Sequence, residues 1–212
     1  FYDLIPVLSF ILSRGKCRYC KTKLPIFYPA IEITTGLIFA FVFYFFKTES
    51  IINITYYLVV VSSFIVIFFQ DIKYGIIADK ILVFATAISL LFLFIFKNEV
   101  FLNHFVFGLT SFLFFVSISV VFYLVTKKQG MGGGDIKLSF LLGLFLGFPN
   151  ILVSLYLAFL TGAILSIILI LWKKKKFLKD SLPFGPFLIT GGLISFFFGN
   201  LIYSKALNFL GF

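Results

Sequence analysis

The sequence predicts an all-α protein that crosses a membrane several times, and three observations support this fold class. Hydrophobic residues make up 61% of the chain and charged residues only 12%, whereas ordinary soluble domains carry about 25% charged residues. The mean hydropathy is +1.14. Long apolar runs recur after residue 25, and many approach the length of about 20 residues that a membrane-spanning helix needs. This composition excludes a water-soluble domain.

Seven apolar runs are candidate membrane helices, separated by short polar loops. They are continuously apolar rather than alternating, which favours helices over the strands of a membrane barrel. The fifth run is short, so its limits are the least defined. We expect about seven transmembrane helices, near residues 26–46, 51–69, 76–96, 101–125, 138–148, 151–172 and 183–201.

The first 25 residues are the only sizeable stretch outside these runs, with two prolines, two cysteines and five basic residues. We therefore expect a small cytoplasmic segment at 1–25 and a transmembrane domain at 26–212. The chain begins at Phe1 without an initiator Met or a cleavable signal segment, so we expect it to be part of a longer protein.

Basic residues sort to alternate loops. Of the eighteen Lys and Arg residues, fifteen lie in the N-terminal segment and in the loops near 75, 130 and 176. The remaining three, Lys47, Lys97 and Lys205, lie in the loops on the opposite side of the membrane. The positive-inside rule therefore places the N-terminal segment and the loops near 75, 130 and 176 in the cytoplasm, and the C-terminus outside. The net charge of +10 indicates contact with anionic lipid, above all at the lysine run 173–176, rather than nucleic-acid binding.

Two acidic residues stand out as candidates for catalysis. Asp71 ends an apolar run. An ionised carboxylate close to hydrocarbon is unfavourable in free energy, so such residues usually have a function. The alternative is a plain interfacial charge. Asp135 follows three glycines, Gly132 to Gly134, at the entrance to the next run on the same side of the membrane. Glycines allow backbone conformations closed to other residues, which would suit a carboxylate that meets a substrate backbone; a flexible linker is the alternative.

Two carboxyl groups on one face of the membrane offer a complete hydrolytic mechanism. One can act as a base toward water while its protonated partner polarises a peptide carbonyl. A serine triad or histidine-based metal site is unsupported, because no Gly-x-Ser-x-Gly motif occurs and the single histidine, His104, lies near the outer end of a run.

Cys17 and Cys20 form one Cys-x-x-Cys pair in the cytoplasmic segment. A structural disulfide is disfavoured in that compartment, while a metal is plausible. A closed zinc site needs four ligands, and the chain has no second pair. Zinc binding and free thiols both remain open.

Taken together, these segments resemble the bacterial type IV prepilin peptidases, membrane aspartic proteases with a Gly-x-Gly-Asp motif. Asp71 to Asp79 is similar to the first aspartate motif, although Ala78 stands where proline is usual. Gly132, Gly134, Asp135 and Lys137 match the second motif, and Pro183, Gly185 and Pro186 match a late Pro-Phe-Gly-Pro element. The resemblance covers residues 2–9, 14–20, 28–32, 35–36, 71–79, 132–138 and 183–187.

The resemblance implies that Asp71 and Asp135 remove the short basic leader from prepilin or pseudopilin precursors at the cytoplasmic face of the bacterial inner membrane, without a cofactor. Many members also methylate the new N-terminus with S-adenosylmethionine, an activity assigned to the segment around Gly15, Lys16 and the cysteines. A first membrane helix and a second Cys-x-x-Cys pair, which would complete a zinc site at Cys17 and Cys20, are expected upstream of Phe1.

Two other functions are compatible with parts of the sequence. A transporter or channel could use Asp71 and Asp135 as a proton or cation relay, but the acids lie at helix ends and no paired broken helices are evident. A scaffold for pilus or secretion assembly would leave the glycine-rich aspartate motif unexplained.

Overall fold

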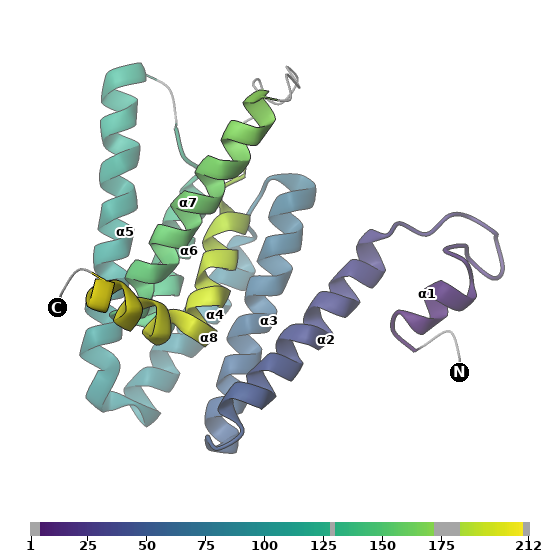
Figure 1. Cartoon of the computed structure of the whole chain (residues 1–212), viewed down its shortest axis with the longest axis horizontal. Helices are drawn as coiled ribbons and strands as arrows, with labels where there is room; N and C mark the ends of the chain where they lie inside the picture. The colour runs from purple at the N-terminus through teal and green to yellow at the C-terminus, as the bar shows by residue number, and fades with distance from the viewer. Residues whose placement is uncertain (1–4, 128–129, 172–182, 210–212) are drawn as a thin grey trace. The chain divides into compact units, whose positions relative to one another are not determined.

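The computed structural model describes residues 5–127, 130–171 and 183–209, which fold into helices joined by short loops (Figure 1). Within these ranges the only β-type pairing is one isolated antiparallel bridge between Lys16 and Lys23. The predicted all-α class is confirmed. The helices are α1 (Leu8–Leu12), α2 (Phe27–Phe46), α3 (Ile51–Tyr74), α4 (Asp79–Phe96), α5 (Asn98–Thr126), α6 (Gly133–Leu146), α7 (Asn150–Leu171) and α8 (Gly185–Phe209).

Each of the seven predicted runs forms one helix, from α2 to α8. Among the described residues, six are long and apolar enough to cross a membrane, namely α2, α3, α4, α5, α7 and α8. The chain is thus a multi-pass membrane protein. Helix α6 has 14 residues and rises about 21 Å, which is less than the roughly 30 Å of the hydrocarbon core.

Several helices extend beyond the predicted apolar runs. Helix α3 continues past residue 69 through Asp71 to Tyr74, and α8 continues past 201 to Phe209. Hydropathy marks the apolar part of a helix, whereas backbone hydrogen bonding continues into the polar residues at the interface. The lysine run at 173–176 lies outside the described residues.

The chain divides into two compact units, and the first comprises residues 1–65. It contains α1, α2 and the first part of α3. At the turn between α2 and α3, the Asn53 side-chain amide donates to Glu49 Oε2 (2.5 Å), and the Phe46 and Tyr57 rings lie 4.8 Å apart. These contacts fix the α2–α3 turn within the first unit.

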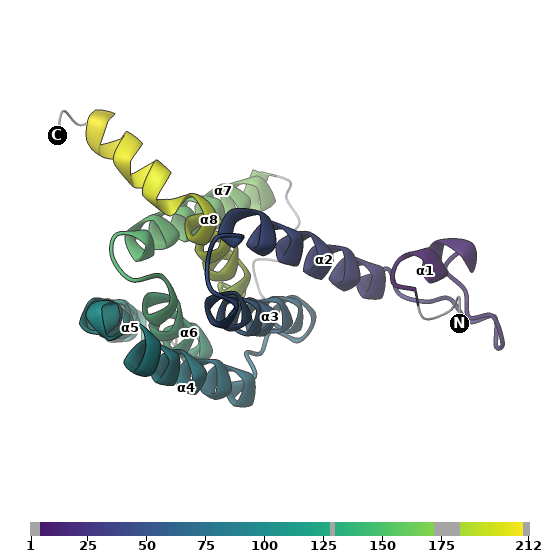
Figure 2. The same ribbon diagram turned by 90° about the horizontal axis from the view of Figure 1, so that it is seen from below.

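The second unit comprises residues 66–212 and is organised around α6. This short helix packs against α4, α5, α7 and α8, and Figure 2 shows it between α4 and α7. Leu138, Leu141, Leu142 and Leu144 on it are fully buried. Other helices therefore surround α6, so its length does not have to match the thickness of the bilayer.

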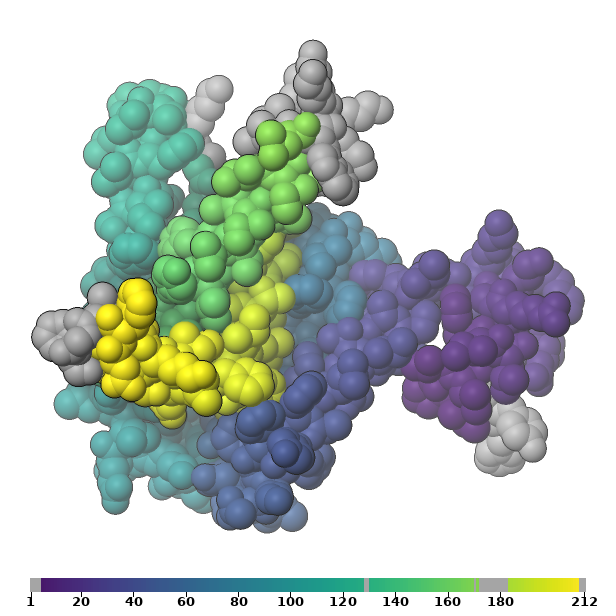
Figure 3. Space-filling view, in the orientation of Figure 1, coloured from purple at the N-terminus to yellow at the C-terminus, as the bar shows by residue number. Residues whose placement is uncertain are grey.

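Small residues allow the closest helix contacts in the second unit. A Cβ atom on Gly143 of α6 would lie 2.6 Å from the Phe107 carbonyl oxygen of α5, and one on Gly191 of α8 would lie 3.0 Å from the Ala158 nitrogen of α7. Figure 3 shows the surfaces of α7 and α8 side by side. Close backbone approach at small residues is a common basis of helix packing in membranes.

Candidate active site

Asp71 lies in the last turn of α3 and is 4% exposed. The helix ends three residues later because Gly75 adopts a left-handed conformation (φ 65°) and its N–H donates to the Asp71 carbonyl (2.8 Å). A glycine in this conformation is a common helix C-terminal cap. The cap ends α3 shortly after Asp71 and turns the chain toward α4.

Asp135 lies in the first turn of α6 and is 9% exposed. Its N–H donates to the Gly132 carbonyl (3.1 Å), which starts the helix. A carboxylate in the first turn of a helix is favoured by the positive end of the helix dipole.

Gly185, the first residue of α8, lies between the two acids. Its backbone amide lies near both carboxyl groups, and the Asp71 carboxyl is close enough to Asp135 for an electrostatic interaction. A Cβ atom on Gly185 would collide with Asp71 Oδ2. Pro186 follows within the first turn of α8, where proline costs no backbone hydrogen bond. The late Pro-Phe-Gly-Pro element therefore meets both aspartate motifs.

A cleft of about 970 Å³ opens over the two acids. Asp71, Asp135 and residues 75–77 line it, together with the glycine run, Pro183 and a face of α7. Asp71 Oδ2 is buried in this cleft and has no hydrogen-bond partner among the described residues. An unpaired buried carboxyl oxygen is costly, so the cleft has an acceptor that a water molecule or substrate group can satisfy.

The glycine run before Asp135 acts differently from the expectation. Gly132 has an ordinary extended conformation (φ −68°), Gly133 and Gly134 are helical, and none has a positive φ. The expectation of a special backbone conformation is therefore wrong. Glycine is instead needed at position 134 for its small size, because a Cβ atom there would lie 2.9 Å from Ile77 Cβ. Gly134 lets α6 approach the loop that follows Asp71.

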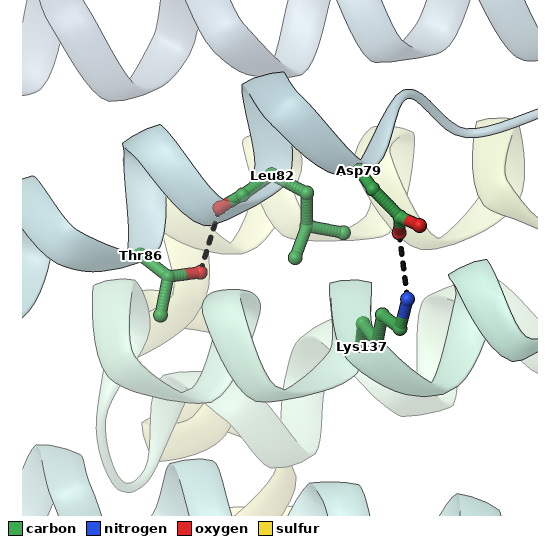
Figure 4. Close-up of polar contacts among 4 residues, drawn as sticks. All are labelled: Asp79, Leu82, Thr86 and Lys137. Atoms are coloured by element: carbon green, nitrogen blue, oxygen red, sulfur yellow. Dashed lines mark hydrogen bonds and ion pairs between the residues drawn. The ribbon is translucent and has the colours of Figure 1, made fainter.

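Lys137 forms an ion pair that the sequence did not predict. Its Nζ lies 2.7 Å from Asp79 Oδ1, and Figure 4 shows it reaching from α6 to the first turn of α4. Both side chains are at least half exposed and both line the cleft. The pair joins the beginnings of α4 and α6, the latter carrying Asp135.

The structure places His104 away from the acids, as expected. Its Nδ1 lies 2.7 Å from the Leu144 carbonyl oxygen. Leu144 is nine residues along α6 from Asp135, which corresponds to about 13 Å of helix.

Four residues of α7 that line the cleft were not predicted from the sequence. These residues are Phe159, Gly162, Ala163 and Ser166, and the available signal was the helical spacing of the last three, which are small residues in an otherwise bulky run.

The remaining candidates lie in the first unit. Cys17 and Cys20 are free thiols at a tight turn. Hydrogen bonding by Thr22, with a smaller effect of Cys17, lowers the pKa of Cys20 to about 7. This favours the thiolate, which is the metal-binding form. The two sulfurs fit half of a tetrahedral zinc site, but the described residues hold no group of three or more potential metal ligands.

A second cavity, of about 370 Å³, lies in the same unit. Lys16, Cys17, Glu32 and several aromatic rings line it. Gly15 does not line it but has a left-handed conformation (φ 67°) beside the Phe10 ring, which helps the chain to turn after α1.

Comparison with known proteins agrees with these features. Residues 58–167 match the type IV leader peptidase family, and residues 1–46 match the bacterial peptidase A24 N-terminal domain. No solved structure matches the chain.

Several curated relatives are named prepilin leader peptidase/N-methyltransferase. The one from Bacillus subtilis is 27% identical over 95% of this chain and 78% of its own length. That from Pseudomonas aeruginosa is 29% identical over 100% and 72%, and that from Aeromonas hydrophila is 32% identical over 93% and 67%. Because the family match covers more than half of the chain, this protein belongs to the type IV leader peptidase family.

Proposed function

We propose that the protein is an aspartic endopeptidase that removes the short basic leader from prepilin or pseudopilin precursors. The observation that carries this proposal is the pairing of two buried carboxyl groups, Asp71 from α3 and Asp135 from α6, in one cleft and beside one backbone amide, that of Gly185. The names of the relatives identify prepilins as the substrate class.

The geometry suits hydrolysis by a shared-proton pair. Two neighbouring buried carboxyl groups do not ionise together readily, so one holds a proton while the other is charged. The charged carboxylate removes a proton from a water molecule, and the protonated carboxyl donates a hydrogen bond to the peptide carbonyl. The hydroxyl adds to the carbonyl carbon, the C–N bond breaks, and the departing amine takes a proton.

We place this chemistry at the cytoplasmic face of the bacterial inner membrane. Fifteen of the eighteen basic residues lie in one set of loops, which the positive-inside rule assigns to the cytoplasm. Lys73 and Lys137 belong to this set and lie near the two acids along the chain. A basic leader on the cytoplasmic side of a precursor would thus reach the cleft without crossing the membrane.

The test is leader removal from a purified precursor in lipid by Asp71→Asn and Asp135→Asn variants. Asparagine keeps the size of aspartate but cannot exchange a proton, so each change should lower cleavage at least about a hundredfold. The double variant should be scarcely worse than either single variant, since the two acids act as a unit. Glu99→Gln, an exposed acid in the first turn of α5, is the matched control. Substantial cleavage by either single variant would refute the mechanism.

We further propose that the cavity beside Lys16 binds S-adenosylmethionine for methylation of the new N-terminus. Its volume of about 370 Å³ is within the range of small-molecule sites. The Lys16 ammonium can pair with the cofactor's carboxylate, and the aromatic rings can contact its sulfonium. The bound cofactor supplies the methyl group. Lys16→Gln should weaken binding of radiolabelled S-adenosylmethionine while leader removal continues; undiminished binding would contradict this role.

A further inference from the structure

The cleft has a second side that takes no part in the carboxyl chemistry. Phe159, Gly162, Ala163 and Ser166 line it, and we call these four residues the α7 wall. Their spacing of three, one and three residues places them on a single face of α7. The α7 wall therefore lies along the same cleft as Asp71 and Asp135.

The α7 wall offers an apolar surface without free hydrogen-bond donors. The Ser166 hydroxyl donates to the Gly162 carbonyl within the helix (2.7 Å), so its donor is already satisfied. The Phe159 ring is held by a stacked contact with Phe115 (5.9 Å) and a tilted contact with Phe184 (5.3 Å). This surface is suited to apolar side chains and not to a charged leader.

Packing within the protein does not require the small size of Gly162. A Cβ atom there would make ordinary contacts with Phe184 (3.5 Å) and Phe187 (3.8 Å). At Gly191, by comparison, a Cβ atom would press against the backbone of α7. Small residues at 162 and 163 leave space in the cleft itself, which Asp71 also lines.

We propose that the α7 wall binds the apolar stretch of the precursor that directly follows the scissile bond. This inference rests on the proposed peptidase function. The family resemblance implies that precursors are cut after a short basic leader and before an apolar helix, so a precursor bound at the two acids has a basic stretch on one side of the bond and an apolar stretch on the other. The α7 wall is formed by small and aromatic side chains and carries no charge, so the apolar stretch packs there.

The first test fills this space. Ala163→Leu adds bulk at an exposed position and keeps a good helix former. We expect the KM for a precursor in lipid to rise about tenfold with little change in kcat. Ala87→Leu, the same change at an exposed position of α4 that does not line the cleft, is the matched control and should leave both constants unchanged.

A second precursor makes the test specific to the proposed contact. In it, the bulky apolar residues just after the scissile bond are replaced by alanine. The KM penalty of Ala163→Leu should shrink with this smaller substrate. An unchanged KM for the first precursor, or an equal penalty for both precursors, would overturn the proposal. Absence of cleavage by the unaltered protein would instead refute the peptidase function itself.

Photo-crosslinking provides a measurement that does not depend on the bulky variant folding. A photo-reactive amino acid in place of Ala163, in the Asp135→Asn background, should crosslink to the precursor within its apolar stretch. The same amino acid in place of Ala87 should not. Crosslinking of position 163 to lipid alone, or to the leader alone, would show that another group occupies the α7 wall and would overturn the proposal.

Discussion

Asp71 and Asp135 could be selected from the sequence as catalytic candidates because their local surroundings alone make a charge costly, and the proposed catalysis stays a prediction. Asp71 ends an apolar run and Asp135 begins one, and both side chains are buried. The role of Gly185 could not be predicted in the same way. Its importance depends on the first residue of α8 meeting the last turn of α3, a tertiary contact between segments that are distant in sequence.

The structure predicts that Gly185→Ala strongly impairs leader cleavage. The new Cβ atom would collide with Asp71 Oδ2, so either α8 or the carboxyl group must move. Displacements of about 1 Å at a reacting centre can lower a rate by about a hundredfold. The measurement is the initial cleavage rate of Gly185→Ala in lipid, with the amount of protein matched by immunoblot.

Gly36→Ala provides the control for this change, since a Cβ atom on Gly36 of α2 would meet nothing within 4 Å. It should cleave at the rate of the unaltered protein. A Gly185→Ala variant with full activity would show that the Asp71 carboxyl group does not need its observed position.

At the level of single elements, the existence and type of the helices were predictable but their partners were not. Continuous apolar runs identify helices, and each predicted run formed one. Such runs do not distinguish a helix facing lipid from one surrounded by protein, because both are apolar; α6 is of the second kind. The Lys137–Asp79 pair was missed for a related reason, since which loops meet is decided by the packing of α4 against α6.

We expect this ion pair to position the first turn of α6, with a modest effect on rate. Exposed ion pairs contribute about 0.2–1 kcal/mol, which corresponds to about a 1.4-fold to fivefold change. Lys137→Gln and Asp79→Asn should each lower kcat by an amount in this range, and the double variant should be no worse than the single variants. The measurement is a double-mutant cycle on kcat and KM.

Lys80→Gln is the matched control for that cycle, because Lys80 is an exposed neighbour of Asp79 that does not line the cleft. Complete loss of cleavage in the Asp79→Asn variant would instead assign this acid a part in the chemistry. Additive losses in the double variant would show that the two side chains act separately.

For the whole molecule, the two units contain different candidate chemistry. The thiols and the smaller cavity lie in the first unit, and both acids and the larger cleft lie in the second. Composition predicted a boundary at residue 25, where a polar segment meets the first apolar run, whereas the first compact unit extends to residue 65. The limit of the first compact unit could not be predicted, since it falls within a continuous helix, α3.

This division predicts that the cysteines are dispensable for cleavage. A Cys17→Ser, Cys20→Ser variant should retain leader removal, because neither residue lines the cleft that holds the acids. Its zinc content, measured by elemental mass spectrometry, should fall if the thiols hold a metal. Complete loss of cleavage by a stably expressed variant would contradict the separation of the two activities.

The orientation of the protein in the membrane gives the last prediction, which uses the two ends of α5. This helix has 29 residues and a length of about 43 Å, enough to cross the bilayer, so its ends lie on opposite sides. The positive-inside rule assigns Lys127 to the cytoplasm and the loop with Lys97 to the outside.

Labelling of single cysteines tests this orientation. In the variant without Cys17 and Cys20, which has no other cysteine, Glu99→Cys should react with a membrane-impermeant maleimide on intact cells. Lys127→Cys should react only after the membrane is permeabilised. The reverse pattern would place the mouth of the cleft outside the cell, where a cytoplasmic basic leader could not reach Asp71 and Asp135.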